Sequence, residues 1–441
     1  MDQSNHFQLV IIGIMIFLAL TAVLFLSGVI PGLKTGGGGK STAPLVMWGT
    51  VPEEHLGKLI RTVNENNPSF DLTYVQKNLA SYENDLIGAL ASGKGPDMWL
   101  LGQDSILKNK DKVFLIPFSS FSQRAFKDAF IEEAEIYLAK KGIVALPFIV
   151  DPIVLYWNRD LASGVGVSQP PKTWDEFVNF SVRLTIKDGG NIKQSGAALG
   201  EFKNIDHAKE LLSLLMLQAG NPIVDANTLR STLSGLSEGA ALSSNNALRF
   251  FTEFSDPSKS TYSWNGSLPF SKNSFIAGTL AYYFGYAGEY NDIVAKNPHL
   301  NFDVAEIPQI SGGRIRATFA RMEGIAVSKT SPNIAGALLA GIKLTEKESI
   351  AALSKQMFLP PVRRDLLGET VDNPVADVFY KSAIYSRAWL EPDSLSVFEI
   401  FKSMIESVLT GRKKISNAAV DAHIKLNNML ENFAEQEKEQ Q

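Results

Sequence analysis

The sequence predicts an α/β protein preceded by one membrane-spanning helix, and three features of the chain carry that prediction. Residues 7–30 form an uncharged apolar segment, and residues 45–101 alternate short apolar strands with amphipathic helices. Residues 146–161 form a long apolar segment interrupted by two prolines. The first feature predicts an anchor, the second a parallel sheet with helices on both faces, and the third a strand that crosses between lobes.

The apolar segment at residues 7–30, FQLVIIGIMIFLALTAVLFLSGVI, has the properties of an uncleaved anchor. As a helix rising about 1.5 Å per residue it is long enough for a bilayer core of roughly 30 Å. A cleaved signal peptide would have a shorter apolar core, a basic start and small residues at its exit, whereas here only Asp2 precedes the segment as a charge. The chain has no Cys, so an N-terminal cysteine cannot carry a lipid. We therefore expect a short tail at residues 1–6 and a transmembrane helix at residues 7–30.

The Gly-rich stretch GLKTGGGGKSTAP, Gly32–Pro44, superficially matches a phosphate-binding loop. That motif needs a glycine where this chain has Lys34, a strand before it and a helix after it. We interpret residues 31–44 instead as a flexible linker. By the positive-inside rule, Lys34 and Lys40 on the linker side of the span weakly favour a globular part inside the cell. Two lysines are too few to determine the orientation of the span.

The remainder of the chain is long enough for two or three domains of about 150 residues. With 45% hydrophobic residues, 20% charged residues and a net charge of −4, it resembles ordinary globular domains and has no basic field for nucleic acid. The absence of Cys excludes disulfides and thiolate metal sites. The five His residues, at positions 6, 55, 207, 299 and 423, form no i,i+4 pair, so we expect neither a metal nor a cofactor.

The first part of the globular region alternates strands and helices. LVMWG predicts a strand, and Thr50 to Glu53 predict a capping box with a proline at the start of a helix. That helix buries one face, made by Leu56, Leu59, Ile60 and Val63. FDLTYVQ, a helix over Tyr82–Ala91 and GKGPDMWLL complete a β-α-β-α-β order, in which ligands bind at the carboxyl ends of the strands.

The later segments contain the predicted crossing and several helices. LPFIVDPIVLYWNRDL, Leu146–Leu161, predicts the extended crossing, and PPKTWDEF predicts a second capping box from Thr173 and Glu176. Trp174, Phe177, Val178 and Ser181 form the packed face of the helix that follows. Helical patterns continue through Leu217 and return at residues 398–409 and 420–433, and residues 434–441 predict a frayed tail.

The order of several segments resembles one known family. They are YENDLIGALASGKGPDMWLL, VALPFIVDPIVLYWNRDL, PPKTWDEF, FIAGTLAYYFGYAGEY, FDVAEIPQ, EGIAVSKTSPNIAGALLAGIKLTEKES, FLPPVRRDLL and IESVLTGRKKISNAAVDAHIKLNNML. In this order, across residues 45–433, the chain resembles the extracellular solute-binding proteins, family 1, the maltose-binding-like receptors of ABC importers.

The resemblance implies a two-lobe periplasmic-binding-protein-like fold, type II, with a central cleft and a hinge. Carried onto this chain, lobe one is residues 45–147 plus 308–326 and lobe two is residues 148–307 plus 327–433. The crossings lie near residues 145–151, 304–308 and 324–329. It further implies a monomeric, noncatalytic receptor that delivers a carbohydrate to ABC permease subunits. Such receptors work outside the cytoplasm, so we expect a single-pass protein of the cell membrane with its globular part on the extracytoplasmic face.

A sugar site needs aromatic faces and polar groups that satisfy buried hydroxyls. In LAYYFGYAGEY the alternation places Tyr283 and Phe284 toward the core, so Tyr286 and Tyr290 are the cleft candidates, with Glu289 as a polar contact. The remaining candidates are Trp48 and Trp99 at strand ends, Trp264 in polar TYSWNGS, and, by the resemblance, Asp151 as an acidic sugar ligand and Phe398 as a stacking ring. For the aromatic residues the alternative is core packing, and for Asp151 it is a turn before Pro152.

One stretch departs from the family pattern. Where many members carry a Gly-Gly-Trp-like stretch, this chain has FARMEGIAV, so Arg321 and Glu323 replace a stacking surface with charges. The departure leaves an acidic, amino or otherwise modified glycan open beside a neutral one.

Three alternative functions remain at this level. In the first, the solute is a peptide or a polyamine rather than a sugar. In the second, the protein is a receptor that signals or acts as a scaffold without taking part in transport. The third is a serine hydrolase, because GLSEG, Gly235–Gly239, fits the G-x-S-x-G pattern around Ser237. The preceding TLRSTLS is polar rather than a buried strand, and only His299 and His423 follow as formal partners.

Overall fold

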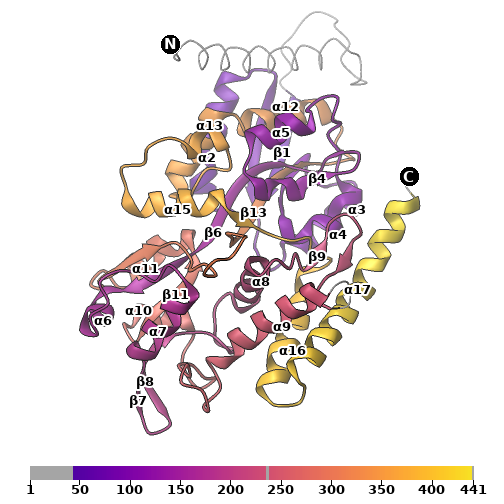
Figure 1. The fold of residues 1–441 in the computed structure, drawn as a ribbon. Helices are drawn as coiled ribbons and strands as arrows, with labels where there is room; N and C mark the ends of the chain where they lie inside the picture. The colour runs from indigo at the N-terminus through magenta and orange to yellow at the C-terminus, as the bar shows by residue number, and fades with distance from the viewer. Residues whose placement is uncertain (1–42, 235–237, 440–441) are drawn as a thin grey trace, which may run out of the picture.

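The structure is a computed structural model that describes residues 43–234 and 238–439. One ten-stranded sheet runs through the molecule in the order β2-β1-β3-β13-β6-β11-β8-β7, with β12 beside β6 and β14 beside β13. Helices cover it in two lobes, one above and one below in Figure 1. The strands are β1 (Ala43–Gly49), β2 (Phe70–Gln76), β3 (Met98–Gly102), β6 (Leu146–Asn158), β7 (Ile186–Asp188), β8 (Asn191–Ala197), β11 (Leu280–Tyr286), β12 (Phe302–Ala305), β13 (Thr318–Val327) and β14 (Ser386–Arg387).

Lobe one is built on parallel strands β1, β2 and β3, with β13 antiparallel to β3. Its helices and small elements are α2 (Glu53–Asn66), α3 (Tyr82–Ala91), η1 (Gln103–Ser105), α4 (Ile106–Asn109), η2 (Lys110–Lys112), α5 (Gln123–Ala129), η3 (Glu132–Tyr137), β4 (Leu138–Ala139), β5 (Gly142–Ile143), α12 (Ile334–Leu344), α13 (Lys347–Met357) and α14 (Arg364–Leu367). The predicted β-α-β-α-β order is confirmed. The predicted cap on α2 is wrong, because Pro52 is the N-cap and Gln76 Oε1 accepts the Glu53 N–H at 3.0 Å instead.

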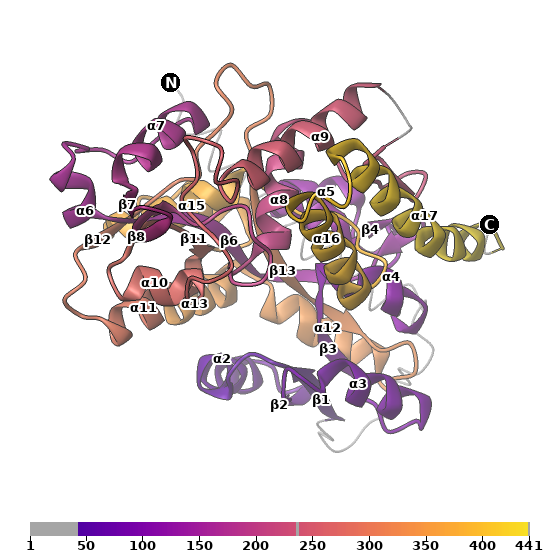
Figure 2. The same cartoon turned by 90° about the horizontal axis from the view of Figure 1, so that it is seen from below.

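Lobe two combines the far half of β6 with β11, β12, β8 and β7. A cluster of α8, α9, α16 and α17 lies to one side of this sheet (Figure 2). The other elements of the lobe and the members of the cluster are α6 (Arg159–Gly164), α7 (Trp174–Leu184), α8 (Ala208–Gln218), β9 (Val224–Asp225), β10 (Arg230–Ser231), α9 (Glu238–Glu253), α10 (Ser271–Ile276), η4 (Ala287–Glu289), α11 (Tyr290–Lys296), α15 (Pro374–Ile384), α16 (Ser394–Leu409) and α17 (Ile415–Glu439). The capping box of Thr173 and Glu176 is confirmed at the start of α7. Helix α17 continues to Glu439, past the predicted end at Phe433.

Two long strands join the lobes. All thirteen residues of β6 are buried; Leu146–Pro152 pair with β13, and Ile153–Trp157 pair with β11. β13 in turn pairs with β3 of lobe one through residues 323–327. The register between β6 and β13 shifts between Glu323 and Gly324, so the extra residue of the bulge is Phe148 on β6.

The predicted lobe boundary fails at one place. Residues 327–433 were expected in lobe two, yet α12 and α13 contact α2, and α12 also contacts β1 and β2. α12 follows β13 where that strand ends beside β3, and a short connection keeps neighbouring elements together. Its buried face, including Ala337, Leu338 and Leu344, therefore covers the sheet of lobe one.

No helix within the described ranges is long and apolar enough to cross a membrane. The predicted anchor at residues 7–30, the predicted linker up to residue 42 and Ser237 lie outside the described residues.

Candidate functional site

Charged and aromatic side chains from both lobes meet near the hinge strands. Arg321 and Glu323 are two residues apart on β13 and so share a face. Asp104, just past the carboxyl end of β3, lies near enough to Glu323 and to Tyr286 at the end of β11 for its charge to raise the pKa of both side chains. The charge of Glu210 at the start of α8 likewise raises the pKa of Tyr286. We call Asp104, Glu210, Tyr286, Arg321 and Glu323 the cleft cluster.

Arg321 is fixed by a carboxylate from the crossing strand. Its Nε and Nη2 donate to Asp151 Oδ2 at 3.1 and 2.7 Å, and its guanidinium carbon lies 4.5 Å from the centre of the Tyr286 ring. The side chain of Asp151 is 2% exposed and that of Arg321 57%. Burial raises the pKa of Asp151, and the charge of Arg321 opposes that rise. The guanidinium is therefore held in one place while much of it faces solvent.

The second oxygen of Asp151 is also occupied. Oδ1 accepts the backbone N–H of Gly288 at 2.9 Å, and a Cβ at position 288 would lie 2.9 Å from Asp151 Oδ2, so only glycine allows this approach. Asp151 was expected to contact the solute directly. In the structure it is buried and both of its oxygens are bonded within the protein, so it orients Arg321 instead.

Tyr286 and Glu289 belong to a second network. Tyr286 is 5% exposed, because Arg321 covers one side of it and the ring of His207 meets it edge-on at 4.6 Å. Glu289 Oε1 lies 2.6 Å from His207 Nε2, and Oε2 accepts from Tyr283 at 2.8 Å and Lys272 at 3.0 Å. These contacts leave Glu289 fewer free acceptors than expected of a solute ligand.

The pKa values in this network follow from its pairing. Burial alone would raise the pKa of Glu289, but the hydrogen bond and charge of His207, with the charge of Lys272, lower it to about 2. Burial alone would lower the pKa of His207, but the hydrogen bond and charge of Glu289 raise it. Each side chain thus favours the charged form of the other.

Glu323 has an unused acceptor. Its Oε2 is buried and has no hydrogen-bond partner among the described residues. Burial raises the pKa of Glu323 to about 7, with Arg321 opposing and Asp104 adding to the rise. A buried carboxylate oxygen without a partner is costly unless a ligand or solvent satisfies it.

The other predicted aromatic residues divide into two groups. Trp48 is partly exposed, with Lys77 Nζ 3.5 Å from its ring centre, and Phe398 is 46% exposed with an edge-on contact to Phe202 at 4.7 Å. Both rings remain available at the surface. Tyr290 instead packs with Phe302, Phe358 and Phe379 in an apolar cluster.

The expectations for Trp99 and Trp264 are wrong. Trp99 is fully buried, because β3 lies between β1 and β13 in the middle of the sheet. Trp264 is 1% exposed, and its Nε1 donates to Asn204 Oδ1 at 3.1 Å, so a residue 60 positions earlier in the chain satisfies the indole N–H inside the core. Neither ring offers a face to a solute.

Several residues of the site were missed from the sequence. Asp104 follows the carboxyl end of a predicted parallel strand, which is where such sheets bind ligands, so that rule is the signal by which it could have been found. Lys209 and Glu391 pair at 2.9 Å through both carboxylate oxygens, with Glu210 3.4 Å from the same Nζ. No local pattern connects residues so far apart in the chain. Among the described residues, no group of three or more His, Asp and Glu is arranged to hold a metal.

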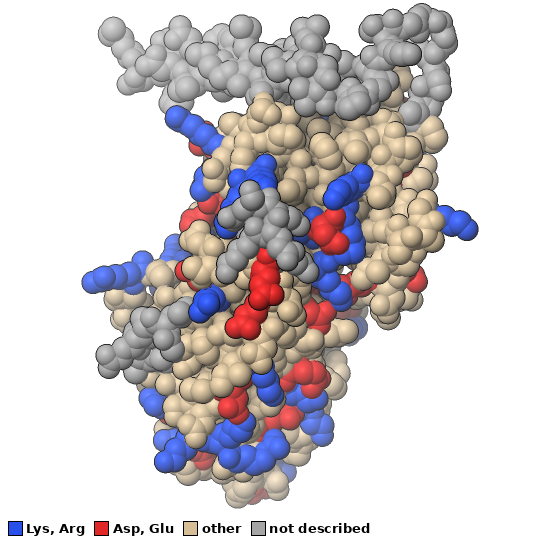
Figure 3. All heavy atoms as spheres, turned by 90° about the vertical axis from the view of Figure 1, so that its right-hand side faces the viewer, with Lys and Arg blue, Asp and Glu red and all other residues tan. Residues whose placement is uncertain are grey.

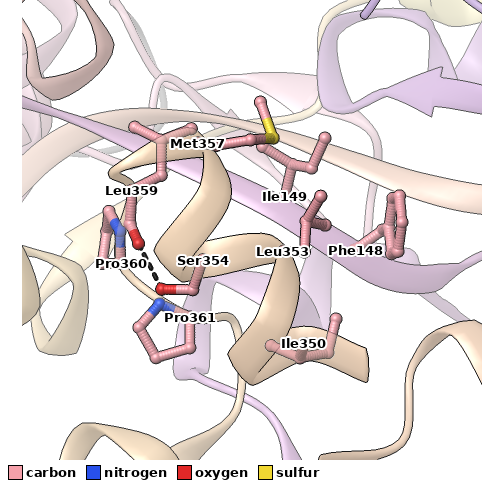
Figure 4. Close-up of a pocket in the computed structure, with 9 residues that line it drawn as sticks. All are labelled: Phe148, Ile149, Ile350, Leu353, Ser354, Met357, Leu359, Pro360 and Pro361. Atoms are coloured by element: carbon pink, nitrogen blue, oxygen red, sulfur yellow. Dashed lines mark hydrogen bonds between the residues drawn. The ribbon is translucent and has the colours of Figure 1, made fainter. Parts of the chain in front are cut away.

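An apolar pocket lies on the lobe-one part of the hinge (Figure 4). It is lined by Phe148 and Ile149 of β6, by residues of α13 including Leu353 and Met357, and by the following Leu359–Pro361. Ser354 is its one polar lining side chain, and its hydroxyl donates to the carbonyl of Leu359. The lining therefore offers almost nothing to a hydroxyl-rich solute.

Comparison with known proteins identifies the family. The family model described as bacterial extracellular solute-binding protein matches residues 58–340, more than half of the chain. The chain belongs to this family, which confirms the resemblance seen in the sequence.

Curated relatives match over shorter stretches. The maltotriose-binding protein of Pyrococcus abyssi (strain GE5 / Orsay) is 30% identical over 111 residues, 25% of this chain and 23% of that protein. The sn-glycerol-3-phosphate-binding periplasmic protein UgpB of Escherichia coli (strain K12) is 25% identical over 169 residues, 35% of this chain and 38% of that protein. The matched stretches thus span well under half of these relatives' lengths.

Solved structures match over nearly the whole described chain. A cyclo/maltodextrin-binding protein complexed with maltotetraose has a TM-score of 0.72 at 20% identity, covering 90% of this chain and 98% of that one. The sugar-binding protein MalE from Xanthomonas citri has a TM-score of 0.74 at 18% identity, covering 88% and 98%. These likenesses confirm the predicted two-lobe α/β fold.

Proposed function

We propose that this protein is a membrane-anchored extracytoplasmic receptor that captures a carbohydrate between its lobes and delivers it to an ABC-type importer. The observation that carries the proposal is the cleft cluster, in which Asp104 of lobe one, Tyr286 and Glu210 of lobe two and Arg321 and Glu323 of the hinge strand interact. Similar proteins support it, since they include a maltotriose-binding protein, the protein CpMnBP1 with mannobiose bound and the GacH receptor in complex with acarbose.

The cluster offers what sugar binding requires. Arg321 has free hydrogen-bond donors, and Glu323 and Asp104 have acceptors. Outside the cluster, the partly exposed rings of Trp48 and Phe398 offer stacking faces. β6 and β13 run between the lobes, so bending at these strands closes the lobes on the solute. Capture of this kind needs no chemical step, and the receptor is noncatalytic.

The anchor and the delivery step rest on other grounds. The uncharged segment at residues 7–30 supports a single span, and family membership supports a globular part outside the cytoplasm. On the face where α17 lies, basic and acidic side chains are intermingled (Figure 3), as on an ordinary soluble domain. Deleting residues 7–30 should move the protein from the membrane fraction to the soluble fraction; a deletion variant that still sediments with membranes contradicts the single-anchor proposal.

Thermal unfolding of the full chain in detergent, against a panel of solutes, tests the capture step. Ligands that bind only the folded state raise its midpoint by mass action. The panel contains neutral oligosaccharides, uronic acids, amino sugars, sugar phosphates, sn-glycerol 3-phosphate, peptides and polyamines. A shift with a sugar class supports the proposal, and a shift with peptides or polyamines alone overturns the carbohydrate assignment.

A further inference from the structure

We infer that the cleft cluster selects a neutral, hydroxyl-bearing solute and rejects anionic ones, with Arg321 as a hydrogen-bond donor that Asp151 positions. This inference rests on the proposed function and narrows it. An exposed arginine in a cleft ordinarily suggests a carboxylate or phosphate ligand. The surroundings of Arg321 argue against an anionic ligand in two respects, the local charge and a neighbouring acceptor, and show in a third that its free donors are preorganised.

The first respect is charge. Arg321 is already paired with Asp151 at 2.7 Å. Five acidic side chains, Asp104, Asp151, Glu210, Glu323 and Glu391, and two cations, Arg321 and Lys209, form a connected set of electrostatic interactions. Burial raises the pKa of Glu323 to about 7 and that of Glu391 to about 8, so these two carboxyls are partly protonated near neutral pH; without them, three carboxylates still stand against two cations. Lys209 is bonded to Glu391, and the nearby Glu289 is balanced by His207 and Lys272. An added anion would therefore enter a region with an excess of negative charge.

The second respect is the number of free donors. A guanidinium has five N–H donors, and Asp151 takes two of them at Nε and Nη2. Three remain on a group that is 57% exposed yet fixed against Asp151 and the Tyr286 ring. A side chain held in this way loses little further freedom on binding, which is the property of a preorganised contact.

The third respect is the neighbouring acceptor. Glu323 follows two residues later on the same face of β13, and its Oε2 has no partner within the described chain. A hydroxyl both accepts from Arg321 and donates to Glu323, whereas a carboxylate or phosphate dianion has only acceptors. An anion would leave an ionised Glu323 unsatisfied and repelled, and could bind beside it only after Glu323 takes up a proton. An ionised Glu323 beside the free donors of Arg321 therefore favours a sugar diol.

Titration calorimetry on the full chain in detergent tests this selection with matched probes. Maltotriose and mannobiose are compared with the same sugars carrying a terminal 6-carboxylate or 6-phosphate, and with sn-glycerol 3-phosphate. We expect the better neutral sugar to bind at least about tenfold more tightly than its anionic forms, as one unsatisfied buried polar contact implies. We also expect the Kd of the neutral sugar to change less than about twofold between low salt and 0.5 M salt, because a neutral sugar forms no ion pair with the protein that salt could screen.

Two variants separate the roles of the ion pair. Arg321→Gln should weaken neutral-sugar binding by about tenfold. Asp151→Asn retains one oxygen for Arg321, places its NH2 against the N–H of Gly288 and removes a negative charge. The lost acceptor at Gly288 should affect both sugar forms alike, whereas the lost charge should reduce the preference for neutral over anionic sugar by about fivefold or more. A merely structural role would lower both affinities equally. Asp128→Asn, on exposed α5, is the matched control and should change neither affinity.

The outcomes distinguish the inference from the proposed function. Tighter binding of a uronate, a sugar phosphate or sn-glycerol 3-phosphate overturns the inference and leaves a receptor. Equal losses for both sugar forms in Asp151→Asn overturn the positioning role. Binding of peptides or polyamines alone, or of nothing in the panel, overturns the proposed function and the inference with it.

Discussion

Two buried carboxylates of this protein form ion pairs that differ in one respect. In the pair of Lys209 and Glu391 the side chains are 7% and 1% exposed, so both partners are enclosed. In the pair of Arg321 and Asp151 the carboxylate is 2% exposed but the cation 57%. The comparison indicates that the exposure of the cation, rather than the existence of the pair, separates a cross-link inside the fold from a contact offered to a solute.

The largest effect is expected in the enclosed pair. Lys209→Met leaves the Glu391 carboxylate buried without its partner, which should lower the free energy of unfolding by about 3–5 kcal/mol. The double variant Lys209→Met, Glu391→Met should recover most of that loss, since it leaves no fully buried charge and only the partly exposed Glu210 loses its cation. Urea unfolding measures both. A loss below about 1 kcal/mol in the single variant would show that water reaches the pair of Lys209 and Glu391, and would contradict the distinction between an enclosed pair and a half-exposed one.

A smaller effect is expected in the half-exposed pair. Arg321→Met removes a cation that is already partly hydrated, and Asp151 keeps the N–H of Gly288. We expect a loss of about 1–3 kcal/mol, again by urea unfolding. Without Arg321 the pKa of Asp151 rises further, so the loss should grow as pH rises from 4 to 8. A loss equal to that of Lys209→Met at every pH contradicts the distinction between the pairs.

The third effect concerns the pair of His207 and Glu289. Because the pKa of His207 is raised, its contribution to stability is complete below about pH 6.5 and is lost as pH rises through its folded pKa. Glu289, with its pKa lowered to about 2, contributes fully above about pH 4.5 and loses that contribution as pH falls toward 2. The pair therefore stabilises most between these limits.

His207→Gln tests the alkaline limb of this dependence. Glutamine can still donate to Glu289 but does not titrate. Between pH 6 and 9 the free energy of unfolding, measured with urea, should therefore fall less for the variant than for the wild type. The expected difference is about 1 kcal/mol over that range. His207 has a φ of 62°, so glutamine adds backbone strain, but strain shifts the whole curve without changing its slope. Parallel curves would show that folding does not raise the pKa of His207.

The smallest effect is expected at an exposed bridge between the lobes. Lys108 Nζ lies 2.8 Å from Glu83 and 2.9 Å from Asp393, and the three side chains are 33%, 35% and 25% exposed. Lys108→Met should cost less than about 1 kcal/mol, and 0.5 M salt should remove the difference. Asp393→Asn is the companion variant, since asparagine still caps α16 at the N–H of Ser396. A salt-independent loss would contradict a surface pair.

The sequence predicted those parts of the fold that local patterns encode. The order of strands and helices in lobe one, the crossing strand β6 and the cap at Thr173 depend on residues within a few positions of each other. The lobe to which α12 belongs was missed, because an amphipathic helix does not reveal which sheet it covers.

The site was predicted less well, for the same reason. Arg321 and Asp151 are 170 residues apart, and Lys209 and Glu391 are 182 residues apart, so nothing local shows that they pair. Trp264 looked exposed because its neighbours are polar, yet Asn204, 60 residues away, satisfies its indole N–H inside the core. Residue type placed Arg321 and Glu323 among the candidates, and only the fold shows which of their atoms are free.

The strand β6 has a further consequence. One half of it completes the sheet of lobe one, the other half completes that of lobe two, and all of it is buried. Cutting the protein into separate lobes would leave each with an open sheet edge and half of an apolar strand in water. We therefore expect the lobes to melt in a single cooperative transition, and chimaeras that exchange a lobe with a homologue to fold only when the hinge strands are kept from one parent.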